Sequence, residues 1–431
     1  MSTSSITVRP LETAAERDAF YWLSSQAFNP GQPDKERAIA GNRRYIEQAP
    51  GFEPGMLRGA FRGATLLGGY HIQERLLRMG KARLPTVCIG SVVTDASYRL
   101  QGVATALMQD AIAYAQSRRQ ALLLLDGIAR FYHRFGYIDM FDVTEQRISR
   151  ATTWALAPSP YAVRPATPDD AATLLALYQQ HSGSYAGSFE RTLEQEQHQL
   201  AGRMQSNNPP LLALNPAGQP SGYLIFPWGP DRSHAVEVAA DSLPAALALL
   251  QHHARLLETL PAPPAEIFWR VPSDAPTLYF LIDYLQVLDT STWGSPSTGW
   301  SVQSQTYHHP DTGWLARPGS MQALAEAMLP EWEARLQQRV ARWSGALVFE
   351  IGAESFTLEV GDAGVHLLEQ PPAQAQRVSL PPQVLTQALF GYRPITWALE
   401  QAGLRPPDDL LPTLTALFPP VETWIAGSDD F

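Results

Sequence analysis

The fold is decided by one stretch, Val92-Val93-Thr94-Asp95-Ala96-Ser97-Tyr98-Arg99-Leu100-Gln101-Gly102-Val103-Ala104-Thr105-Ala106-Leu107-Met108. It leaves a β-branched run at 86–94 that is typical of a central strand. It then enters a segment, 101–117, whose apolar side chains recur at helical spacing. An unbroken apolar run at 121–125 predicts a fully buried strand. Together with a helix predicted over 11–28 and strands over 56–61 and 64–77, this series indicates a mixed α/β fold.

The loop in this stretch has the composition of an anion site. Arg99, Gly102 and Ala104 follow the spacing Arg/Gln-x-x-Gly-x-Gly/Ala. Unpaired N–H groups at a helix start, together with the helix dipole, attract a pyrophosphate. Glycine lets the backbone approach closely, and arginine adds positive charge. The pattern alone leaves an ordinary strand-to-helix connection open as the alternative.

The context of the loop favours the anion site. The segment Phe131-Tyr132-His133-Arg134-Phe135-Gly136-Tyr137 follows the buried strand. This arrangement resembles the GNAT superfamily of acetyl-CoA-dependent acyltransferases over roughly residues 5–150. The resemblance implies acetyl-CoA as co-substrate, without a metal, and a backbone at Val92, Val93 and Thr94 that pairs with the pantetheine arm. It assigns the diphosphate to Arg99 and to the residues Leu100, Gln101, Gly102, Val103, Ala104 and Thr105.

Tyr132 is the candidate general acid. A phenol with a pKa near 10 can give a proton to a leaving thiolate and regain one from solvent. The alternative is an aromatic side chain packed under a short helix with its hydroxyl satisfied. The family resemblance places the general acid at this tyrosine. We expect Tyr137 in the core, His133 at the surface and Cys88 as a buried, inert thiol.

Prolines and weakly patterned stretches divide the chain. Residues 157–160 and 294–319 predict three domains, at 1–157, 158–305 and 306–431. The first two open alike, with Ile6-Thr7-Val8-Arg9-Pro10 and Tyr161-Ala162-Val163-Arg164-Pro165. The second strand-to-helix junction, at 236–247, lacks the Arg-x-x-Gly-x-Ala pattern and has Pro244 in its first helical turn. We expect a degenerate GNAT-like lobe that binds no CoA.

The third domain has a predicted helix over 321–343 followed by strands at 346–351, 355–360 and 365–368. This order resembles a sterol-carrier-protein-like α+β domain, whose apolar stripe is either plain core or the wall of a lipid tunnel. Two tandem GNAT-like lobes followed by such a domain resemble the Eis (enhanced intracellular survival) family of N-acetyltransferases. That resemblance rests also on Leu389-Phe390-Gly391-Tyr392, Leu417-Phe418-Pro419 and the terminal Asp430-Phe431.

The Eis resemblance implies acetylation of small-molecule or peptide amines, including aminoglycosides, and a homo-oligomer, a hexamer. The chain departs from the family at Leu100, where members often carry a second basic residue. It also departs in the loop at 126–131, which lacks the usual acidic-glycine spacing. The physiological amine, whether aminoglycoside-, polyamine- or lysine-like, is not readable from the sequence.

The acidic, aromatic tail is either a solvated end or part of the site. The family resemblance assigns the terminal carboxylate of Phe431 the role of general base, which must take a proton from an ammonium before its nitrogen can attack. Asp430 is then expected to hold a cationic substrate. Asp126 is the reserve candidate for the base and for substrate binding, and a bound water is the third.

Composition excludes several function classes. The 431 residues carry a net charge of −10, so a basic nucleic-acid footprint is not expected. One cysteine excludes a disulfide framework. No apolar run reaches the length of a membrane span, and the start lacks a secretion signal, so we expect a cytoplasmic protein without membrane contact. The remaining alternatives to an N-acetyltransferase are a lipid-binding carrier and a CoA-binding sensor without turnover.

Overall fold

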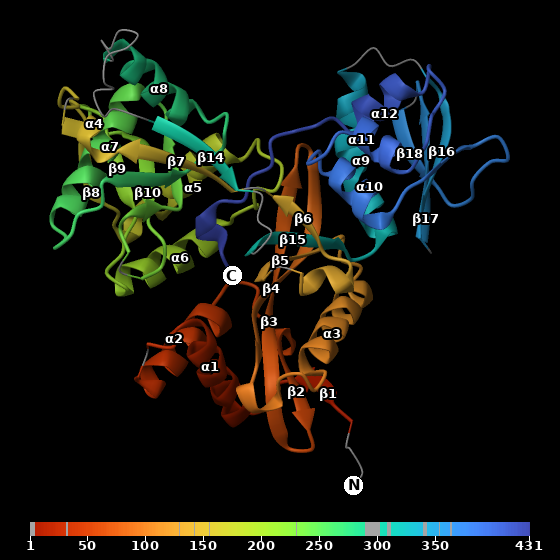
Figure 1. Cartoon of the computed structure of the whole chain (residues 1–431), viewed down its shortest axis with the longest axis horizontal. Helices are drawn as coiled ribbons and strands as arrows, with labels where there is room; N and C mark the ends of the chain where they lie inside the picture. Colours follow the sequence, from red (N-terminus) through yellow and green to blue (C-terminus); the bar gives the residue numbers. More distant parts are fainter. Residues whose placement is uncertain are drawn as a thin grey trace. The chain divides into compact units, whose positions relative to one another are not determined.

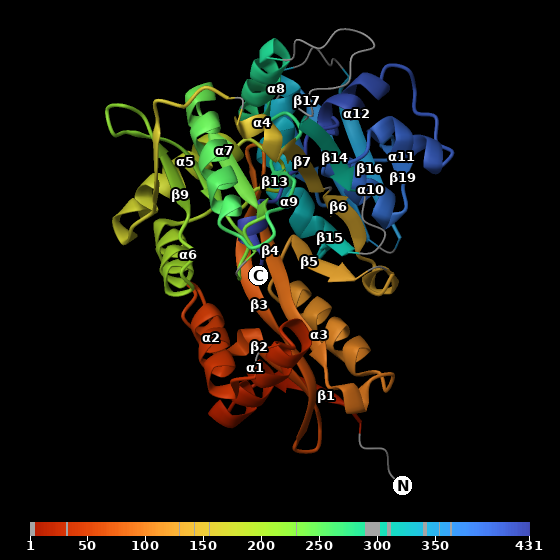
Figure 2. The same ribbon diagram turned by 60° about the vertical axis from the view of Figure 1, so that its left-hand side comes forward.

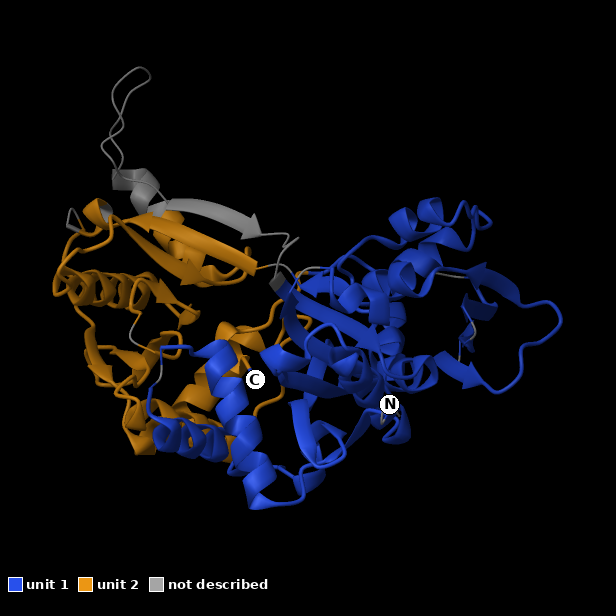
Figure 3. Cartoon of the chain, turned by 60° about the horizontal axis from the view of Figure 1, so that its bottom comes forward, with its two compact units in different colours: residues 1–141, 310–421, 431 blue, residues 142–309, 422–430 orange. Residues whose placement is uncertain are grey.

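The structure of the protein, a computed structural model, describes residues 5–31, 33–128, 130–141, 143–154, 156–229, 231–288, 302–307, 312–338, 343–352, 354–362 and 364–431. The fold is mixed α/β, as predicted (Figure 1, and Figure 2 from a second side). Two compact units make up the chain (Figure 3): residues 1–141, 310–421 and 431 form unit 1, and residues 142–309 and 422–430 form unit 2. In the described ranges, no helix is both long and apolar enough to cross a membrane.

The first sheet lies in unit 1. Its strands, in spatial order, are β1 (Thr7–Pro10), β2 (Leu57–Arg62), β3 (Thr65–Met79), β4 (Ala82–Thr94), β5 (Leu122–Ile128), β15 (Thr312–Pro318) and β6 (Ile138–Phe141). Three helices cover it: α1 (Ala14–Phe28), α2 (Lys35–Glu47) and α3 (Val103–Ser117). The α3 side chains Val103 and Leu107 join one apolar cluster, whereas Phe20 and Ile46 of α1 and α2 join another. The helices therefore cover opposite faces of the sheet (Figure 1).

The local predictions for this lobe are confirmed. The predicted strands at 56–61, 64–77, 86–94 and 121–125 are β2, β3, β4 and β5, and the helices at 11–28 and 101–117 are α1 and α3. Helix α1 starts at a capping box, in which Thr13 accepts from the Glu16 N–H and the Glu16 carboxylate accepts from Thr13. Cys88 is fully buried, as expected.

Two strands join sheets that their sequence position does not suggest. β15 pairs antiparallel with both β5 and β6, although it begins 184 positions after the end of β5 and 171 after the end of β6. Conversely, β7 (Val143–Ser149) pairs with β13 (Glu266–Arg270) and β14 (Val302–Tyr307) in unit 2. The sheets therefore do not follow a boundary at residue 157. The three-domain division stays a prediction, and most of the seam at 294–319 lies outside the described residues.

Unit 2 contains two four-stranded sheets. One has the order β12-β10-β9-β8 and the other β11-β13-β7-β14. The remaining strands are β8 (Ala162–Pro165), β9 (Leu211–Leu214), β10 (Pro220–Ile225), β11 (His234–Ala235) and β12 (Glu237–Ala240). The helices are α4 (Arg150–Trp154), α5 (Ala171–Ser182), α6 (Leu193–Gln205), α7 (Leu243–Glu258) and α8 (Pro276–Leu288).

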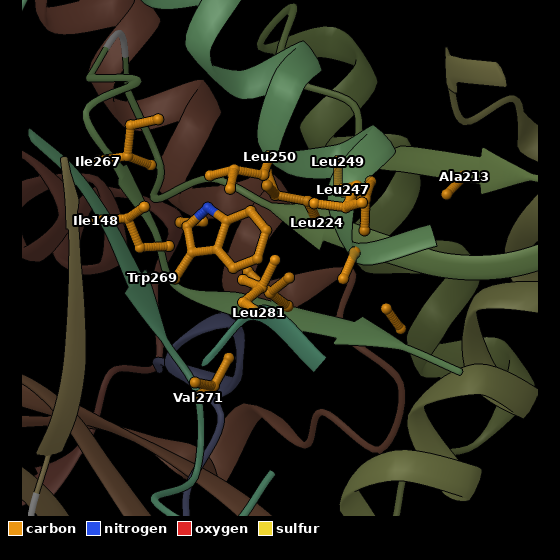
Figure 4. Close-up of a cluster of buried hydrophobic side chains, with 14 of the residues drawn as sticks. Ile148, Ala213, Leu224, Leu247, Leu249, Leu250, Ile267, Trp269, Val271 and Leu281 are labelled. Atoms are coloured by element: carbon orange, nitrogen blue, oxygen red, sulfur yellow. The ribbon is translucent and has the colours of Figure 1, made fainter. Parts of the chain in front are cut away.

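The core of this second lobe surrounds Trp269. The indole is buried among leucines of α7 and α8 (Figure 4). Its N–H donates to Nδ1 of His253 at 3.0 Å. Ile148 of β7 lies opposite Ile267 of β13 and belongs to the same cluster. Apolar burial thus explains why β7 pairs here, because its inward side chains are covered by this core.

The last part of unit 1 is a sheet of order β18-β17-β16-β19 with four helices. Its elements are α9 (Met321–Gln337), β16 (Gly345–Ile351), β17 (Glu354–Gly361), β18 (Gly364–Leu368), β19 (Gln376–Ser379), α10 (Pro382–Leu389), α11 (Ile395–Gln401) and α12 (Leu411–Leu417). The three predicted strands are confirmed, and the predicted helix ends at Gln337. Buried Trp332 stacks on Phe356 at 6.0 Å and meets Phe418 edge-on at 5.8 Å. This apolar stripe is packed aromatic core.

The tail is built into unit 2 up to residue 430. Arg191 is buried and donates from Nε and Nη2 to the Asp429 carboxylate at 3.1 and 2.8 Å. The same guanidinium donates to Ser428 Oγ and to Glu237, both at 2.9 Å, and lies 3.4 Å from the ring centre of Tyr178. A solvated end is therefore excluded for Ser428 and Asp429.

The acids around Arg191 outnumber it. Glu196, 3.7 Å from the guanidinium, completes a buried group with Glu237 and Asp429. Burial is the main cause that raises the pKa of Glu196 to about 7, and the neighbouring carboxylates add to it. The guanidinium is consequently the cation on which this end of the tail depends.

Removing Arg191 should destabilise the protein far more than removing an exposed arginine. Arg191→Leu leaves Asp429 and Glu237 as buried charges, at a cost of about 3–5 kcal/mol. Arg147→Leu is the matched control, because the Arg147–Glu266 pair of the same lobe is 35% exposed on both sides and is worth about 0–1 kcal/mol. Urea unfolding of the full chain measures both. Equal midpoint shifts for the two variants would contradict the prediction.

Candidate active site

The central feature of the first sheet is a parallel pair of strands that separates. β4 and β5 pair at Thr86–Cys88 with Leu122–Leu124, and in these described strands the ladder ends there. β4 nevertheless continues to Thr94 and β5 to Ile128. Beyond the last pair, the edge of β4 that faces β5 has no ladder partner. Backbone groups at such an edge can pair with an extended ligand as an added strand.

A bulge turns β4 at this point. Gly90 pairs with His71 and Val93 with Gly69, so Ser91 and Val92 together face a single β3 residue. Ser91 has a φ of 52°, which is the left-handed conformation at which a strand bends. Of the residues predicted to bind pantetheine, Val93 is buried, whereas Val92 and Thr94 are half-buried. All three lie on the part of β4 past the separation.

The loop after β4 presents the open start of helix α3. Gly102 is its N-cap with a φ of 86°, and a side chain added there would meet nothing within 4 Å. The first intrahelical N–H bond runs from Ala106 to Gly102, so the N–H groups of Val103, Ala104 and Thr105 have no intrahelical acceptor. These groups fit an anion, which gives the expected diphosphate a place to bind.

The neighbouring loop side chains leave this helix start accessible. Arg99 and Leu100 are exposed, and Leu100 also takes a left-handed φ of 61°. Gln101 accepts from Arg62 at 3.1 Å and donates to the Ser97 carbonyl at 3.2 Å, which ties the loop to β2. The predicted loop residues are therefore brought together at one helix end.

The corresponding helix of the second lobe is closed. The side chain of Ser242 accepts from the Ala245 N–H at 3.4 Å and so caps α7 itself. Pro244 has no N–H to offer. The first turn of α7 thus has fewer free donors than that of α3. That this lobe binds no CoA stays a prediction.

Tyr132 is the first residue of the short 3-10 helix Tyr132–Phe135, and its ring lies against Gly127 of β5. Its side chain is 7% exposed, and a Cβ at Gly127 would come within 2.5 Å of its ring. Phe131 packs edge-on against it at 4.9 Å. In the described part of the chain its hydroxyl makes no hydrogen bond. Burial, with a smaller contribution from Asp126, raises the pKa of Tyr132 to about 12. The phenol is therefore protonated at neutral pH.

The predicted burial of two neighbours of Tyr132 is confirmed: Tyr137 lies in the core, and His133 lies at the surface. Tyr137 is fully buried and its ring lies 6.1 Å from that of Tyr132. His133 is exposed and contacts Asp139 at 3.3 Å.

The terminal residue Phe431 returns to unit 1. One oxygen of its carboxylate lies 2.7 Å from where a Cβ on Gly90 would be, and its ring packs 5.4 Å from that of Trp314. Trp314 is opposite Asp126 in the β15–β5 register. Gly90 lies just past the separation on β4, and Asp126 just past it on β5. Phe431 therefore contacts β4, and Tyr132 contacts β5, just past the end of their ladder. Asp126 is exposed on β5, whereas Asp430 is exposed and belongs to unit 2.

Sequence reasoning missed Trp314, His71 and Arg191. Trp314 lies in the stretch 294–319, whose weak pattern predicts a domain boundary, although Trp314, Leu315 and Ala316 form a short buried run. His71 interrupts the apolar middle of a predicted strand, which was the only available signal. Arg191 has none, because its acidic partners are distant in sequence.

Comparison with known proteins identifies the first lobe. Residues 7–138 match the family described as Acetyltransferase (GNAT) domain. No curated protein matches the chain. Solved structures match over 99% of this chain and 100% of theirs: a probable N-acyltransferase from Enterococcus faecalis (17% identity, TM-score 0.71), a GCN5-related N-acetyltransferase from Anabaena variabilis (16%, 0.69) and Eis1 from Mycobacterium abscessus (19%, 0.61). At these identities they show a common fold. Since the family match covers the strands and loop described above, the chain carries a GNAT acetyltransferase domain and is an acetyltransferase.

Proposed function

We propose that the protein is an acetyl-CoA-dependent N-acetyltransferase of primary amines, with Tyr132 as general acid and the Phe431 carboxylate as general base. The observation that carries the proposal is the carboxylate oxygen against Gly90, where β4 separates from β5. The similarity in fold to Eis1 supports assignment to an Eis-like group with a sterol-carrier-protein-like third domain. A homo-oligomer and a cytoplasmic location belong to the same proposal.

The residues present fit acetyl-CoA. The free N–H groups of α3 at Val103–Thr105, with Arg99 beside them, would hold the diphosphate, and β4 at Val92–Thr94 would pair with the pantetheine amides. Bound there, acetyl-CoA supplies an acetyl group activated as a thioester. Leu100 adds no charge, so affinity rests on the helix end and on Arg99.

The Phe431 carboxylate and the Tyr132 hydroxyl each carry out one of the two proton transfers. The Phe431 carboxylate takes a proton from the substrate ammonium, which frees the nitrogen lone pair. The Tyr132 hydroxyl donates its proton to the leaving sulfur, and solvent replaces it. Asp126 is an exposed carboxylate on β5, opposite Trp314 in the strand register, so a cationic amine is the substrate class that we propose. We retain Asp430 as a further contact for such a cation.

Acetyl-CoA should bind at one site per chain and depend on Gly102. Gly102→Asp places a carboxylate at the diphosphate position and should abolish binding. Gly102→Asn is the matched control, since asparagine has the same size, tolerates a positive φ and carries no charge. Titration calorimetry measures both. Two equivalent sites in the wild type, or equal affinities for the two variants, would refute the proposed site.

Tyr132→Phe should lower kcat by about 10²–10⁴-fold and leave the affinity for acetyl-CoA unchanged, because it removes only the acid. Tyr137→Phe is the control, since Tyr137 is buried nearby and its hydroxyl is unsatisfied among the described residues. CoA release across an amine panel measures kcat. If Tyr132→Phe turns over within about threefold of the wild type when chemistry limits the rate, Tyr132 is structural.

The position of the terminal carboxylate should matter more than the last side chain. A two-glycine extension moves the carboxylate by ~7 Å, outside hydrogen-bond reach of its proton. It should be nearly inactive, while Phe431→Ala keeps the carboxylate and retains partial activity. Steady-state kinetics and thermal melts test this. Normal turnover of the extended protein would mean that the general base is Asp126 or a water and not the terminal carboxylate. If the wild type releases CoA with none of the amines, a lipid-binding carrier or a CoA-binding sensor would be favoured.

A further inference from the structure

A buried histidine lies beside the terminal carboxylate. His71 is in the middle of β3, opposite Gly90 of β4, and is 1% exposed. Among the described residues, neither of its ring nitrogens has a hydrogen-bond partner. Leaving a buried polar atom unsatisfied costs about 1–3 kcal/mol. An imidazole kept in this state within a sheet core calls for a functional reason.

Gly90 shows where the imidazole points. A Cβ built on this glycine would lie 2.3 Å from Cε1 and 2.7 Å from Nε2 of His71, and 2.7 Å from the carboxylate oxygen of Phe431. Nε2 of His71 and the carboxylate oxygen of Phe431 each lie 2.7 Å from the same point, so they are at most 5.4 Å apart. Gly90 does not have a positive φ, so its backbone conformation would accept alanine. Space for the imidazole and the carboxylate is what the glycine provides.

The protonation state of His71 suits a donor. Burial lowers the pKa of His71 to about 4, and the ring is neutral at neutral pH. A neutral imidazole has one N–H and one acceptor nitrogen. When the proton is on Nε2, this nitrogen is a hydrogen-bond donor on the side of the ring near Phe431. A hydrogen bond from it to the carboxylate would be charge-assisted. Such a bond would orient the carboxylate without removing its negative charge.

We propose that His71 is a positioning residue for the catalytic base. Its Nε2–H, which has no partner among the described residues, becomes during turnover the donor that holds the Phe431 carboxylate beside Gly90. This inference rests on the proposed role of that carboxylate. A base acts only within about 2.6–3.2 Å of the proton that it takes, and the last residue of a chain is fixed from one side alone. His71 supplies the second attachment, and Gly90 the room for it.

Two substitutions at His71 test the donor. His71→Leu removes it at similar volume and should lower kcat by about 10²-fold, the effect of a misplaced catalytic group. His71→Gln can place an amide N–H near the same point and should restore most of the activity. Acetyl-CoA affinity and the melting temperature should be those of the wild type for both. If His71→Gln is as impaired as His71→Leu, a purely structural role holds and the inference fails.

Gly90→Ala tests the same contact without changing His71. The added methyl group would collide with the carboxylate and the imidazole, so kcat should fall comparably while acetyl-CoA affinity is kept. This variant also decides the matter if His71→Leu does not fold. Wild-type kcat for Gly90→Ala would overturn the inference.

A double-variant cycle separates this inference from the proposed function. His71→Leu is made in the wild type and in the two-glycine extension, and the residual kcat of all four proteins is compared. If His71 acts through the carboxylate, His71→Leu causes no further loss in the extended protein. An equal fold-loss in both backgrounds would refute the positioning role while leaving the base in place. An extension that does not affect kcat would instead refute the proposed base.

Discussion

The end of the β4–β5 ladder is the constraint on which the site depends. Parallel strands in a sheet interior normally satisfy each other's backbone groups along their length, because buried N–H and C=O groups need partners. Here the ladder ends at Cys88 and Leu124, and β4 bends at the Ser91 bulge. The unpaired edge of β4 can then accept another extended chain, and helix α3 begins directly after it. Tyr132 contacts β5 at Gly127, and Phe431 contacts β4 at Gly90, just past the point where the two strands separate.

The local part of this arrangement could be predicted from the sequence. The β-branched run of β4, the apolar spacing of α3 and the unbroken leucines of β5 are short-range patterns, and each is confirmed. The helix start at Gly102 was predictable for the same reason, since a positive φ and an uncapped first turn depend on adjacent residues. The expected anion site could therefore be located from the sequence alone, because its loop lies between a recognisable strand and a recognisable helix.

The long-range part could not be predicted. β15 and β7 carry no local signal for the sheet that they join, because pairing energy depends on the complementary edge and not on the strand alone. The contact between Trp314 and the ring of Phe431 could consequently not be predicted. The tail was ambiguous for a similar reason. Its three negative charges suggest a solvated end until Arg191, distant in sequence, is found to be buried against Asp429.

The tail places two neighbouring carboxylates in different surroundings. Asp429 is fully buried and bonded to the guanidinium of Arg191, and this contact anchors the tail. Phe431 follows two residues later, and the ring beside its carboxylate is the imidazole of His71, whose lowered pKa keeps it neutral. A neutral donor orients a carboxylate while depressing its basicity less than a cation does. Under the proposed function, anchoring and proton transfer make different demands on a carboxylate. The tail offers one group for each, since Asp429 is bonded to a guanidinium and Phe431 lies beside an imidazole.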